Sequence, residues 1–446
     1  MIKANLYKWQ DNKELFSAQK KVKINSVFVV LFTVAIITIT QCLGINVLIW
    51  AAMCIYLLTM LTAKDDDLIP FLLFFLPWSP ILKITPTSIS FASIATILIL
   101  FKYILIKKPY IDTRLMVLFL WIFVFSFVVK IAQGYDLTLN YFMLMFMFFA
   151  FPFLFGCVKE KTNYVKCVRF FALGIIAAAV TSEIFSTNPF LIRYIKIFSQ
   201  EAIGVTRLCG FYGDPNFYSA QIVAAFGGLL VVLSCKEKTD LLDIILIIAL
   251  IAVGVISISK SYLMCTILVF ALWGIASLRK PSKFIVGSLI VSIIIFILLS
   301  SGVFDEIITE YLARFGVATD ASTLTTGRSD IWKNYLNFML DNPLSLFFGQ
   351  GCTSEAMVKK GSHNSLIQLV YQLGIFGCVI FVFLIKYLFT MTRNKEHKKT
   401  NFMCSVMWFV ACFTMWLGLD MLFFDDFFLI IILCSLGMNY IRQYNV

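Results

Sequence analysis

Long, unbroken apolar runs constrain what this chain can fold into. The run at 217–235, for example, contains no charged residue. Each helix that crosses a membrane needs roughly 20 apolar residues, and its backbone groups must be hydrogen-bonded within the segment. The runs are continuous and do not alternate, so they predict spanning helices and not the strands of a barrel. Charged residues make up only 14% of the chain, against about a quarter of a soluble domain, which excludes the soluble class.

The predicted fold class is therefore all-α: a polytopic integral membrane protein with about 14 transmembrane helices (roughly 12–14) in a single transmembrane domain over residues 1–446. The third apolar run is short and carries Pro70, Pro77 and Pro80, so we expect a broken or re-entrant segment there. The expected spans lie near 24–42, 43–62, 69–84, 89–106, 115–133, 139–158, 165–185, 217–235, 241–259, 261–277, 284–303, 363–391, 402–419 and 427–441.

The distribution of basic residues predicts the orientation of the chain. Residues 1–23 are polar and amphipathic, so we expect no cleavable signal peptide and an uncleaved anchor in the first apolar run. Most of the 37 Lys and Arg residues fall in segments on the side of both termini, and cytoplasmic segments carry such an excess. We therefore expect both termini in the cytoplasm. Topology and attraction to anionic lipid explain the net charge of +12, so no nucleic-acid partner is expected.

The 12 cysteines fall chiefly in the apolar runs, where they act as small hydrophobic residues. Cys209 and Cys352 lie outside these runs, where they could form a disulfide or stay unpaired. No Cys-x-x-Cys spacing occurs, so no metal site is expected.

Two segments are much longer than the other loops, 187–216 and 304–362, and the topology places both on the outer (periplasmic) side. Long loops with their own structure tend to carry function. In the second, the spacing of apolar residues predicts short helices. One, over "FDEIITEYLARF", should lie flat on the membrane, and another should begin at Ser329 or Asp330 and end before Pro343. Outer-side cations gather in both segments: Arg193, Lys196 and Arg207, then Arg314, Arg328, Lys333, Lys359 and Lys360.

Three of the cations are candidates for holding an anion. Arg207 has no helix end to cap and suits a phosphate clamp. Arg328 stands just ahead of a predicted helix, where its guanidinium and free N–H groups can hold an anion, although a plain surface arginine fits equally well. Lys260 interrupts a long apolar stretch at the outer boundary, and is either a lysine that snorkels from a tight turn or a third cation of the same site.

The remaining candidates are polar side chains at the starts of apolar runs. Asp214 and Asn216 flank Pro215 directly ahead of one run, which favours helix capping over catalysis for Asp214. Only two histidines occur in the chain, and one of them, His363, precedes Asn364 where the second outer segment meets an apolar run. A histidine there either caps the helix or acts as a base near neutral pH.

A series of short motifs follows a fixed order along the chain: Arg207-x-x-Gly210, Asp214-Pro215-Asn216, Gly327-Arg328-x-x-x-Trp332, Asn342-Pro343-Leu344, Gly349-x-Gly351, His363-Asn364 and Gly374-x-x-Gly377. This order, around a large outer loop in a protein of many spans, resembles the O-antigen ligase and polymerase superfamily of bacterial envelope glycosyltransferases. The resemblance implies an all-helical transferase of the bacterial cytoplasmic (inner) membrane. Its donor would be an undecaprenyl-diphosphate-linked oligosaccharide, and it would need no metal or cofactor. Membrane lipids and a chain-length regulator protein are further expected partners.

The resemblance also implies roles for the candidate residues. Outer-loop cations would hold the diphosphate, which assigns that role to Arg207, Arg328 and Lys260. The loop histidine would activate the acceptor hydroxyl, and Asp214, Asn216 and Asn364 would support the site. The family often shows Ser-Arg where this chain has Ser259-Lys260, which keeps the charge but loses the bidentate geometry of arginine. The chemistry suits these residue types, because cations stabilise a departing diphosphate and a base deprotonates a sugar hydroxyl.

Three functions stay open at this point. A polymerase transfers the glycan to another lipid-linked repeat unit of an O-antigen or capsular polysaccharide, and the divergent, Phe-rich remainder of the chain favours this function. A ligase transfers it to the lipid A core, and the His-Asn pair is a familiar ligase feature. A lipid-linked oligosaccharide flippase or other transporter could have as many spans, but transporters usually show internal repeats and charges near the bilayer midplane. Neither is evident in this sequence.

Overall fold

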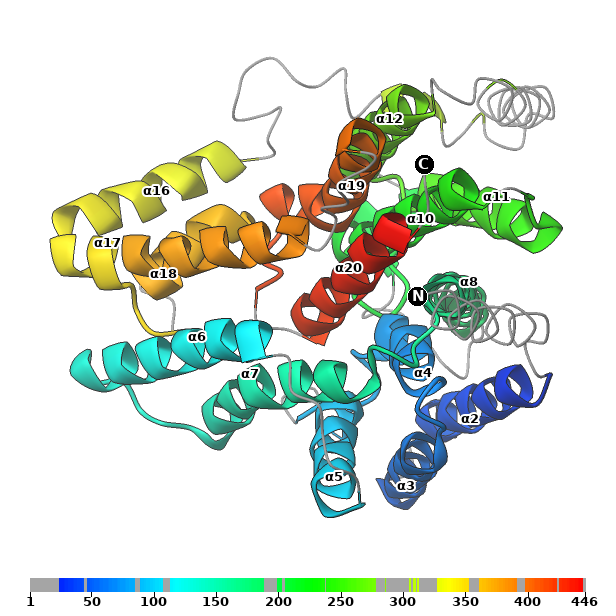
Figure 1. Ribbon diagram of the computed structural model, residues 1–446, viewed down its shortest axis with the longest axis horizontal. Helices are drawn as coiled ribbons and strands as arrows, with labels where there is room; N and C mark the ends of the chain where they lie inside the picture. Colours follow the sequence, from blue (N-terminus) through cyan, green and yellow to red (C-terminus); the bar gives the residue numbers. More distant parts are fainter. Residues whose placement is uncertain are drawn as a thin grey trace, which may run out of the picture.

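The computed structural model describes residues 24–43, 46–84, 89–106, 113–187, 199–202, 205–236, 238–277, 327–352, 361–390, 398–422 and 425–443, with a few isolated positions between 285 and 312. Nearly all of the described elements are helices (Figure 1). They are α2 (Ile24–Leu43), α3 (Asn46–Thr62), α4 (Leu68–Phe75), η1 (Leu76–Trp78), α5 (Phe91–Ile106), α6 (Thr113–Ala132), α7 (Leu139–Val158), α8 (Tyr164–Thr187), α10 (Pro215–Cys235), α11 (Leu241–Ile256), α12 (Lys260–Ala276), α16 (Arg328–Asp341), α17 (Pro343–Phe348), α18 (Ser365–Thr390), α19 (Lys398–Phe413), η3 (Thr414–Gly418) and α20 (Asp425–Gln443).

Within the described residues, five helices are long and apolar enough to cross a membrane: α6, α10, α18 and most of α7 and of α8. Other apolar helices, including α3, α11 and α12, are shorter. The protein is therefore an all-α membrane protein, as predicted. The expected total of about 14 spans is not confirmed, and the apolar run expected at 284–303 lies almost entirely outside the described residues.

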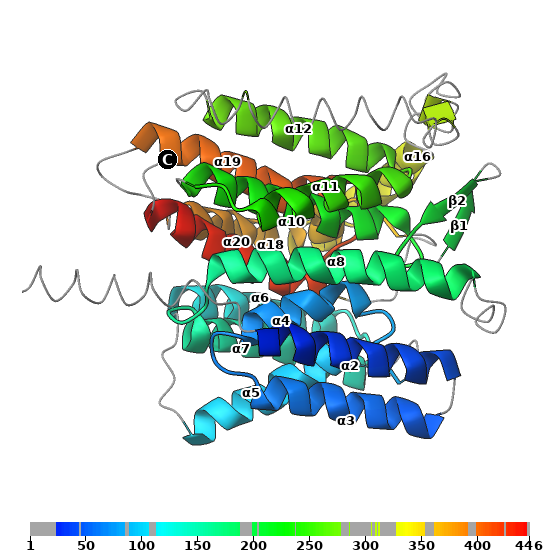
Figure 2. The same cartoon turned by 90° about the vertical axis from the view of Figure 1, so that its right-hand side faces the viewer.

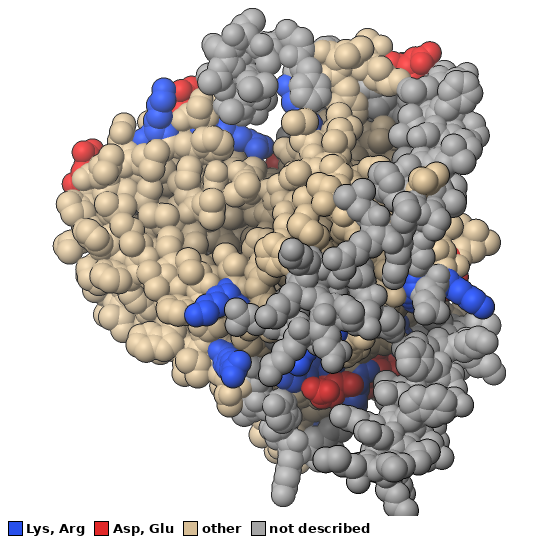
Figure 3. Space-filling view, turned by 45° about the horizontal axis from the view of Figure 1, so that its top comes forward, with Lys and Arg blue, Asp and Glu red and all other residues tan. Residues whose placement is uncertain are grey.

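The helices differ in how far they are enclosed by the protein. In the most apolar window of α10, 89% of the residues are buried, against 33% in α6 and in α18. Helix α10 packs against α8, α12 and α19, whereas α6 and α18 pack against each other. Figure 3 shows a broad face without Lys, Arg, Asp or Glu, with charged side chains toward its margins. A peripheral apolar surface of this kind suits contact with lipid.

Aromatic side chains fill part of the interior. The rings of Phe151 on α7 and Phe428 on α20 stack with their centroids 4.9 Å apart, and Phe148 meets Phe428 edge to face at 5.1 Å. All three side chains are buried. The Phe-rich composition, with 46 phenylalanines in the chain, therefore serves the core as well as the apolar surface.

The proline-rich third run is broken, as predicted. Helix α4 covers only Leu68–Phe75, and the 3₁₀ turn η1 continues it to Trp78. Pro77 lies in that turn, where its missing N–H and fixed φ do not favour a continued α-helix. Helix α4 packs on α8, and the backbone of Phe74 touches Gly174 so closely that a Cβ at 174 would collide with it.

The segment 187–216 contains an element that the sequence did not predict. Strands β1 (Ser199–Ala202) and β2 (Val205–Leu208) form an antiparallel hairpin, with Ser199 opposite Leu208 and Gln200 opposite Arg207. Figure 2 shows this hairpin and α16 toward one end of the helix layers and the C-terminus toward the other. Arg207 lies on β2, and the short segment that follows this strand leads to the start of α10.

Helix α16 begins earlier than predicted. Its first residue is Arg328, and Gly327 precedes it in the left-handed region with φ of 79°. Glycine adopts this φ without strain, so the helix starts directly after Gly327 and not at Ser329 or Asp330. It ends at Asp341, before Pro343, as predicted. Most of the helix expected over "FDEIITEYLARF" lies outside the described residues.

Candidate active site

Arg207 is anchored on the turn between α11 and α12. Its Nε donates a hydrogen bond to the carbonyl of Ser257 at 3.3 Å, and its side chain is almost fully buried. Residues 257–259 form this turn, and Ile258 takes a φ of 48°. The arginine that the sequence singled out thus lies inside the protein beside a tight turn and not on an open loop surface.

Asp214 and Asn216 tie the start of α10 to the start of α12. The Asp214 carboxylate accepts hydrogen bonds from the backbone N–H and the side-chain amide of Asn216, at 2.8 and 2.9 Å, and so caps α10. The Ser259 hydroxyl donates to Oδ1 of Asn216 at 2.7 Å and also caps α12. Lys260, the first residue of α12, is half-buried next to this contact. Arg207, Asp214, Asn216 and Lys260 therefore gather around one turn.

Arg328 lies at the start of α16 and reaches the end of the 3₁₀ turn η3. Its Nη1 donates to the carbonyl of Gly418 at 2.8 Å. A Cβ on Gly418 would lie 2.9 Å from this nitrogen. The guanidinium can occupy this position because residue 418 has no side chain. Burial lowers the pKa of Arg328 from its usual value, while the charges of Asp214 and Asp420 oppose that shift. These two carboxylates therefore lie near Arg328, and an arginine stays protonated at neutral pH in any case.

The backbone around His363 is held by Asp420, a residue that is not among the candidates predicted from the sequence. One carboxylate oxygen accepts the backbone N–H of His363 at 2.9 Å, and the other accepts the N–H of Asn364 at 3.3 Å. The Ser362 hydroxyl donates to the same carboxylate. A Cβ on Gly361 would lie 2.6 Å from Oδ2 of Asp420, so a glycine permits this close approach.

The His363 side chain takes no part in capping α18. The Asn364 side chain does that, since its Oδ1 accepts the N–H groups of Leu366 at 2.9 Å and Ile367 at 3.3 Å. His363 takes a φ of 48°, and its Nδ1 is buried without a hydrogen-bond partner in the described part of the chain. Because Asn364 supplies the cap, the imidazole is not needed to satisfy the first N–H groups of α18.

Helix α16 also fixes the His363 segment from its other side. Trp332, on the first turns of α16, donates its Nε1–H to the carbonyl of Ser362 at 2.9 Å. Because Arg328 is four residues earlier, it lies on the same helix face as Trp332. The Gly327-Arg328-x-x-x-Trp332 motif therefore positions the cation and the histidine segment together.

The glycine motifs near α17 and α18 are structural. Gly374 takes a φ of 65° and interrupts α18. A Cβ there would lie 2.5 Å from the backbone nitrogen of Phe348, and a Cβ on Gly349 would lie 2.5 Å from that of Leu373. The backbone leaving α17 thus touches the kink directly, and the N–H groups of residues 350 and 351 bond the carbonyls of residues 371 and 372. These glycines shape the frame behind the site.

The structure thus brings the predicted residues together in two linked groups. Arg207, Lys260, Asp214 and Asn216 surround residues 257–259, whereas Arg328, His363 and Asn364 contact or adjoin residues 418–420. The charge interaction of Arg328 with Asp214 joins the two groups. A lone acidic residue at the end of the apolar run 402–419 is the signal that could have identified Asp420.

A pair of acidic residues, also missed from the sequence, lies at the start of α20. The Asp425 carboxylate accepts the hydroxyls of Ser79 at 2.7 Å and Ser93 at 3.2 Å. Buried Asp426 contacts the hydroxyl of Tyr212 and accepts from the side-chain amide of Gln221. Tyr212 follows the first motif and precedes Asp214, so this pair braces the segment that carries the site.

Cys209 and Cys352 do not form the disulfide that the sequence left open, because both are free thiols. Each is buried; Cys209 Sγ contacts the carbonyl of Arg207 at 3.4 Å, whereas Cys352 lies near Ser126 and Lys130. In the described residues, no group of three or more His, Cys, Asp or Glu side chains is arranged to hold a metal ion. Arg193, Lys196, Arg314, Lys359 and Lys360 lie outside the described residues.

Residues 244–382 match the family model described as O-antigen ligase. The matched segment contains Lys260, Arg328 and His363, but Arg207, Asp214 and Asp420 lie beyond it. The resemblance drawn from the motifs is confirmed over this segment. A search of curated proteins finds no match to the chain. The match over this segment and the apolar helices are consistent with a membrane enzyme of the O-antigen ligase or polymerase type.

Proposed function

With residues 244–382 assigned to the O-antigen ligase family, we propose that this chain is a membrane glycosyltransferase that polymerises undecaprenyl-diphosphate-linked oligosaccharide repeat units into O-antigen or capsular polysaccharide. The reaction takes place at the outer face of the bacterial cytoplasmic membrane, with both termini in the cytoplasm. The segments 187–216 and 304–362 are then the periplasmic loops that carry the site, within one transmembrane domain.

The observation that carries this proposal is the convergence of Arg328 and His363 on residues 418–420. Arg328 binds the carbonyl of Gly418, and the His363 backbone binds Asp420 two residues later. Residues 418–420 therefore hold both the Arg328 guanidinium, which can stabilise a leaving group, and the backbone of His363, whose imidazole can act as a base. Transfer from a polyprenyl diphosphate needs these two functions within a few ångströms of one sugar.

Arg328, Arg207 and Lys260 are proposed to stabilise the departing diphosphate. Arginine presents a planar fork that matches phosphate oxygens, and partial burial strengthens the interaction because less water screens it. Arg207 is the most buried of the three. Its bond to Ser257 occupies Nε, so its proposed contribution is a fixed positive charge beside the donor.

His363 is proposed as the base. The imidazole takes the proton of an acceptor sugar hydroxyl, and the oxygen attacks the anomeric carbon of the donor. The bond from that carbon to the diphosphate oxygen breaks, and undecaprenyl diphosphate leaves with the electron pair. Asp420, Ser362 and Trp332 hold the His363 backbone, while Asp214, Asn216 and Asn364 support the helix starts around the site. No step in this scheme calls for a metal or a cofactor.

Ligation is the second candidate, because the matched family is described as O-antigen ligase. The two reactions share the donor and the leaving group and differ only in the acceptor, which for a ligase is the lipid A core. A flippase of lipid-linked oligosaccharides is the candidate from another class, but the candidate cations lie around helix starts and loops and not along the middle of spans.

Deletion of the gene separates the three candidates by the surface glycan that results. A polymerase mutant displays single repeat units attached to the acceptor, and a chain-length regulator then has no polymer to control. A ligase mutant accumulates long chains that remain on the carrier lipid. A flippase mutant accumulates lipid-linked oligosaccharide inside the cell, and that result would reject the transferase proposal.

A further inference from the structure

A groove between α6 and α18 lies far from the candidate active site. It has a volume of about 440 Å³, and its walls come from the first turns of α6 and the last turns of α18. Helix α18 begins beside His363 and ends at the groove. Its 26 residues span roughly 39 Å at about 1.5 Å per residue, less a little for the kink at Gly374. The groove is therefore separate from the site near residues 418–420.

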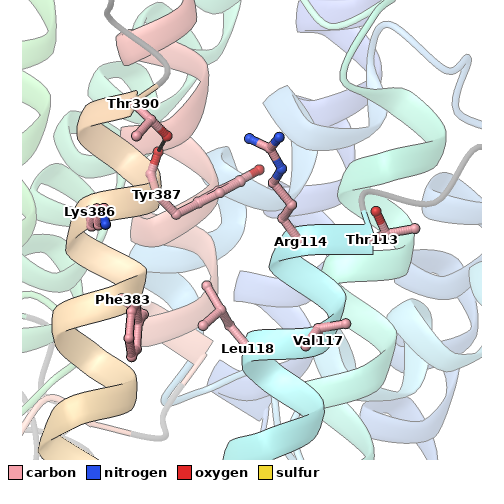
Figure 4. Close-up of a pocket in the computed structure, with 8 residues that line it drawn as sticks. All are labelled: Thr113, Arg114, Val117, Leu118, Phe383, Lys386, Tyr387 and Thr390. Atoms are coloured by element: carbon pink, nitrogen blue, oxygen red, sulfur yellow. Dashed lines mark hydrogen bonds between the residues drawn. The ribbon is translucent and has the colours of Figure 1, made fainter.

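The lining of the groove combines cations with apolar walls. Arg114 comes from α6 and Lys386 from α18, and none of the described residues that line the groove is acidic. Val117, Leu118 and Phe383 form the apolar part, and Phe383 is 52% exposed. Figure 4 shows the Tyr387 side chain reaching from α18 toward Arg114 on α6. Positive charge at one end and apolar surface along the rest match a molecule with an anionic head and a hydrocarbon tail.

The helices that form the groove are peripheral. Only 33% of the most apolar window of α6, and the same share of α18, is buried inside the protein. Both helices also expose large apolar side chains, such as Trp121 on α6 at 60% and Val382 on α18 at 62%. A lipid can therefore enter from the side, without passing through the protein.

We propose that this groove binds a glycerophospholipid with an anionic head group. Arg114 and Lys386 contact the phosphate of the head group, and an acyl chain lies along Val117, Leu118 and Phe383. Basic pockets between membrane helices bind anionic head groups in this way. Because α6 and α18 each lead from the groove toward the end of the molecule that holds the candidate site, the bound lipid lies in the opposite leaflet from the transfer reaction.

The test measures lipid retention by the full-length, delipidated protein in detergent with native mass spectrometry, using phosphatidylglycerol and phosphatidylcholine of equal acyl length. Wild type is expected to retain one phosphatidylglycerol in preference to phosphatidylcholine. The double variant R114Q/K386Q is expected to bind phosphatidylglycerol about tenfold or more weakly, because two charge-assisted hydrogen bonds are lost. The matched control is R442Q, an exposed arginine at the end of α20 outside the groove, which should bind as wild type does.

A second variant keeps the charges and fills the apolar wall. L118W is expected to reduce phosphatidylglycerol retention several-fold, and each single variant, R114Q or K386Q, provides the same comparison if the double variant does not fold. Equal retention of the two lipids, or wild-type retention by R114Q/K386Q, would overturn the proposal. So would complete displacement by millimolar inorganic phosphate, which would show a simple anion site, or a preference for undecaprenyl phosphate, which would assign the groove to the carrier lipid.

Discussion

Oδ2 of Asp420 accepts the backbone N–H of His363 at 2.9 Å, across a sequence separation of 57 residues. The other carboxylate oxygen accepts the N–H of Asn364. This contact joins the end of the η3 segment to the start of α18 and sets the backbone from which the imidazole projects. The backbone of the proposed base is thus held by Asp420, whereas Nδ1 of its ring has no partner among the described residues.

The first prediction concerns Asp420→Asn. An amide has one acceptor oxygen where the carboxylate has two, and its NH₂ group faces N–H donors, so the His363 backbone loses its anchor. Transfer should fall about 10- to 100-fold, measured as glycan chain length and as in vitro turnover of a lipid-linked donor. Asp341→Asn, at the exposed end of α16, is the matched control and should stay active. Full activity of Asp420→Asn would remove Asp420 from the site.

The second prediction concerns His363→Ala and His363→Asn. If His363 is the base, both should lose transfer by roughly 10²- to 10⁴-fold while donor binding persists, because asparagine cannot take up a proton near neutral pH. Asn364 already caps α18, so the Asn variant is not expected to recover activity through capping. His397→Ala tests for a general effect of losing a histidine and should change nothing. An active His363→Asn enzyme at native expression would reject the base assignment.

The third prediction concerns the arginines. Arg328→Ala and Arg207→Ala should each abolish long-chain glycan while the protein stays inserted in the membrane. Arg328→Lys should recover only a small part, because lysine cannot both bond the Gly418 carbonyl and present a fork to a phosphate. Membrane fractionation checks insertion, and gel profiles check chain length. Normal glycan chain length in both alanine variants would contradict the proposed role of Arg207 and Arg328 in holding the diphosphate.

The fourth prediction uses Gly418→Ala, which touches Arg328 without removing it. The added methyl group would lie 2.9 Å from Nη1, and the end of a flexible side chain gives way easily. We expect a nearly unchanged unfolding temperature but transfer about tenfold or more below wild type, because the guanidinium is displaced. The double variant with Arg328→Ala should be no worse than Arg328→Ala alone. Additive losses would show that Gly418 acts by another route.

The fifth prediction concerns topology. A reporter fused after Lys399 should report the cytoplasm, and one inserted near Ser354 should report the outer face, because basic residues concentrate on the side of the termini. Phosphatase and fluorescent-protein fusions measure the two sides independently. The opposite labelling would place the candidate site in the cytoplasm, where a periplasmic transferase cannot work.

The class of fold was determined by the sequence alone. Continuous apolar runs that are long enough to span a bilayer must form helices, because lipid offers no hydrogen-bond partners to the backbone. The broken third run followed from Pro77, and the end of α16 followed from Pro343, because proline restricts its own backbone and that of its neighbour. The helix cap at Asp214 also followed from local chemistry. Each of these features depends on interactions between residues only a few positions apart, so a local sequence pattern is enough to predict it.

The composition of the site was decided only by the tertiary structure. Asp420 reaches the His363 backbone because α18 and η3 pack together, and no local pattern encodes a contact between residues 57 positions apart. Arg207 was predicted as a loop cation, but the β1–β2 hairpin and the 257–259 turn enclose it. Cys209 and Cys352, for which the sequence left a disulfide open, are free buried thiols. Long-range packing sets which side chains meet, because burial and hydrogen bonding are satisfied by the whole assembly of helices and not by any one segment.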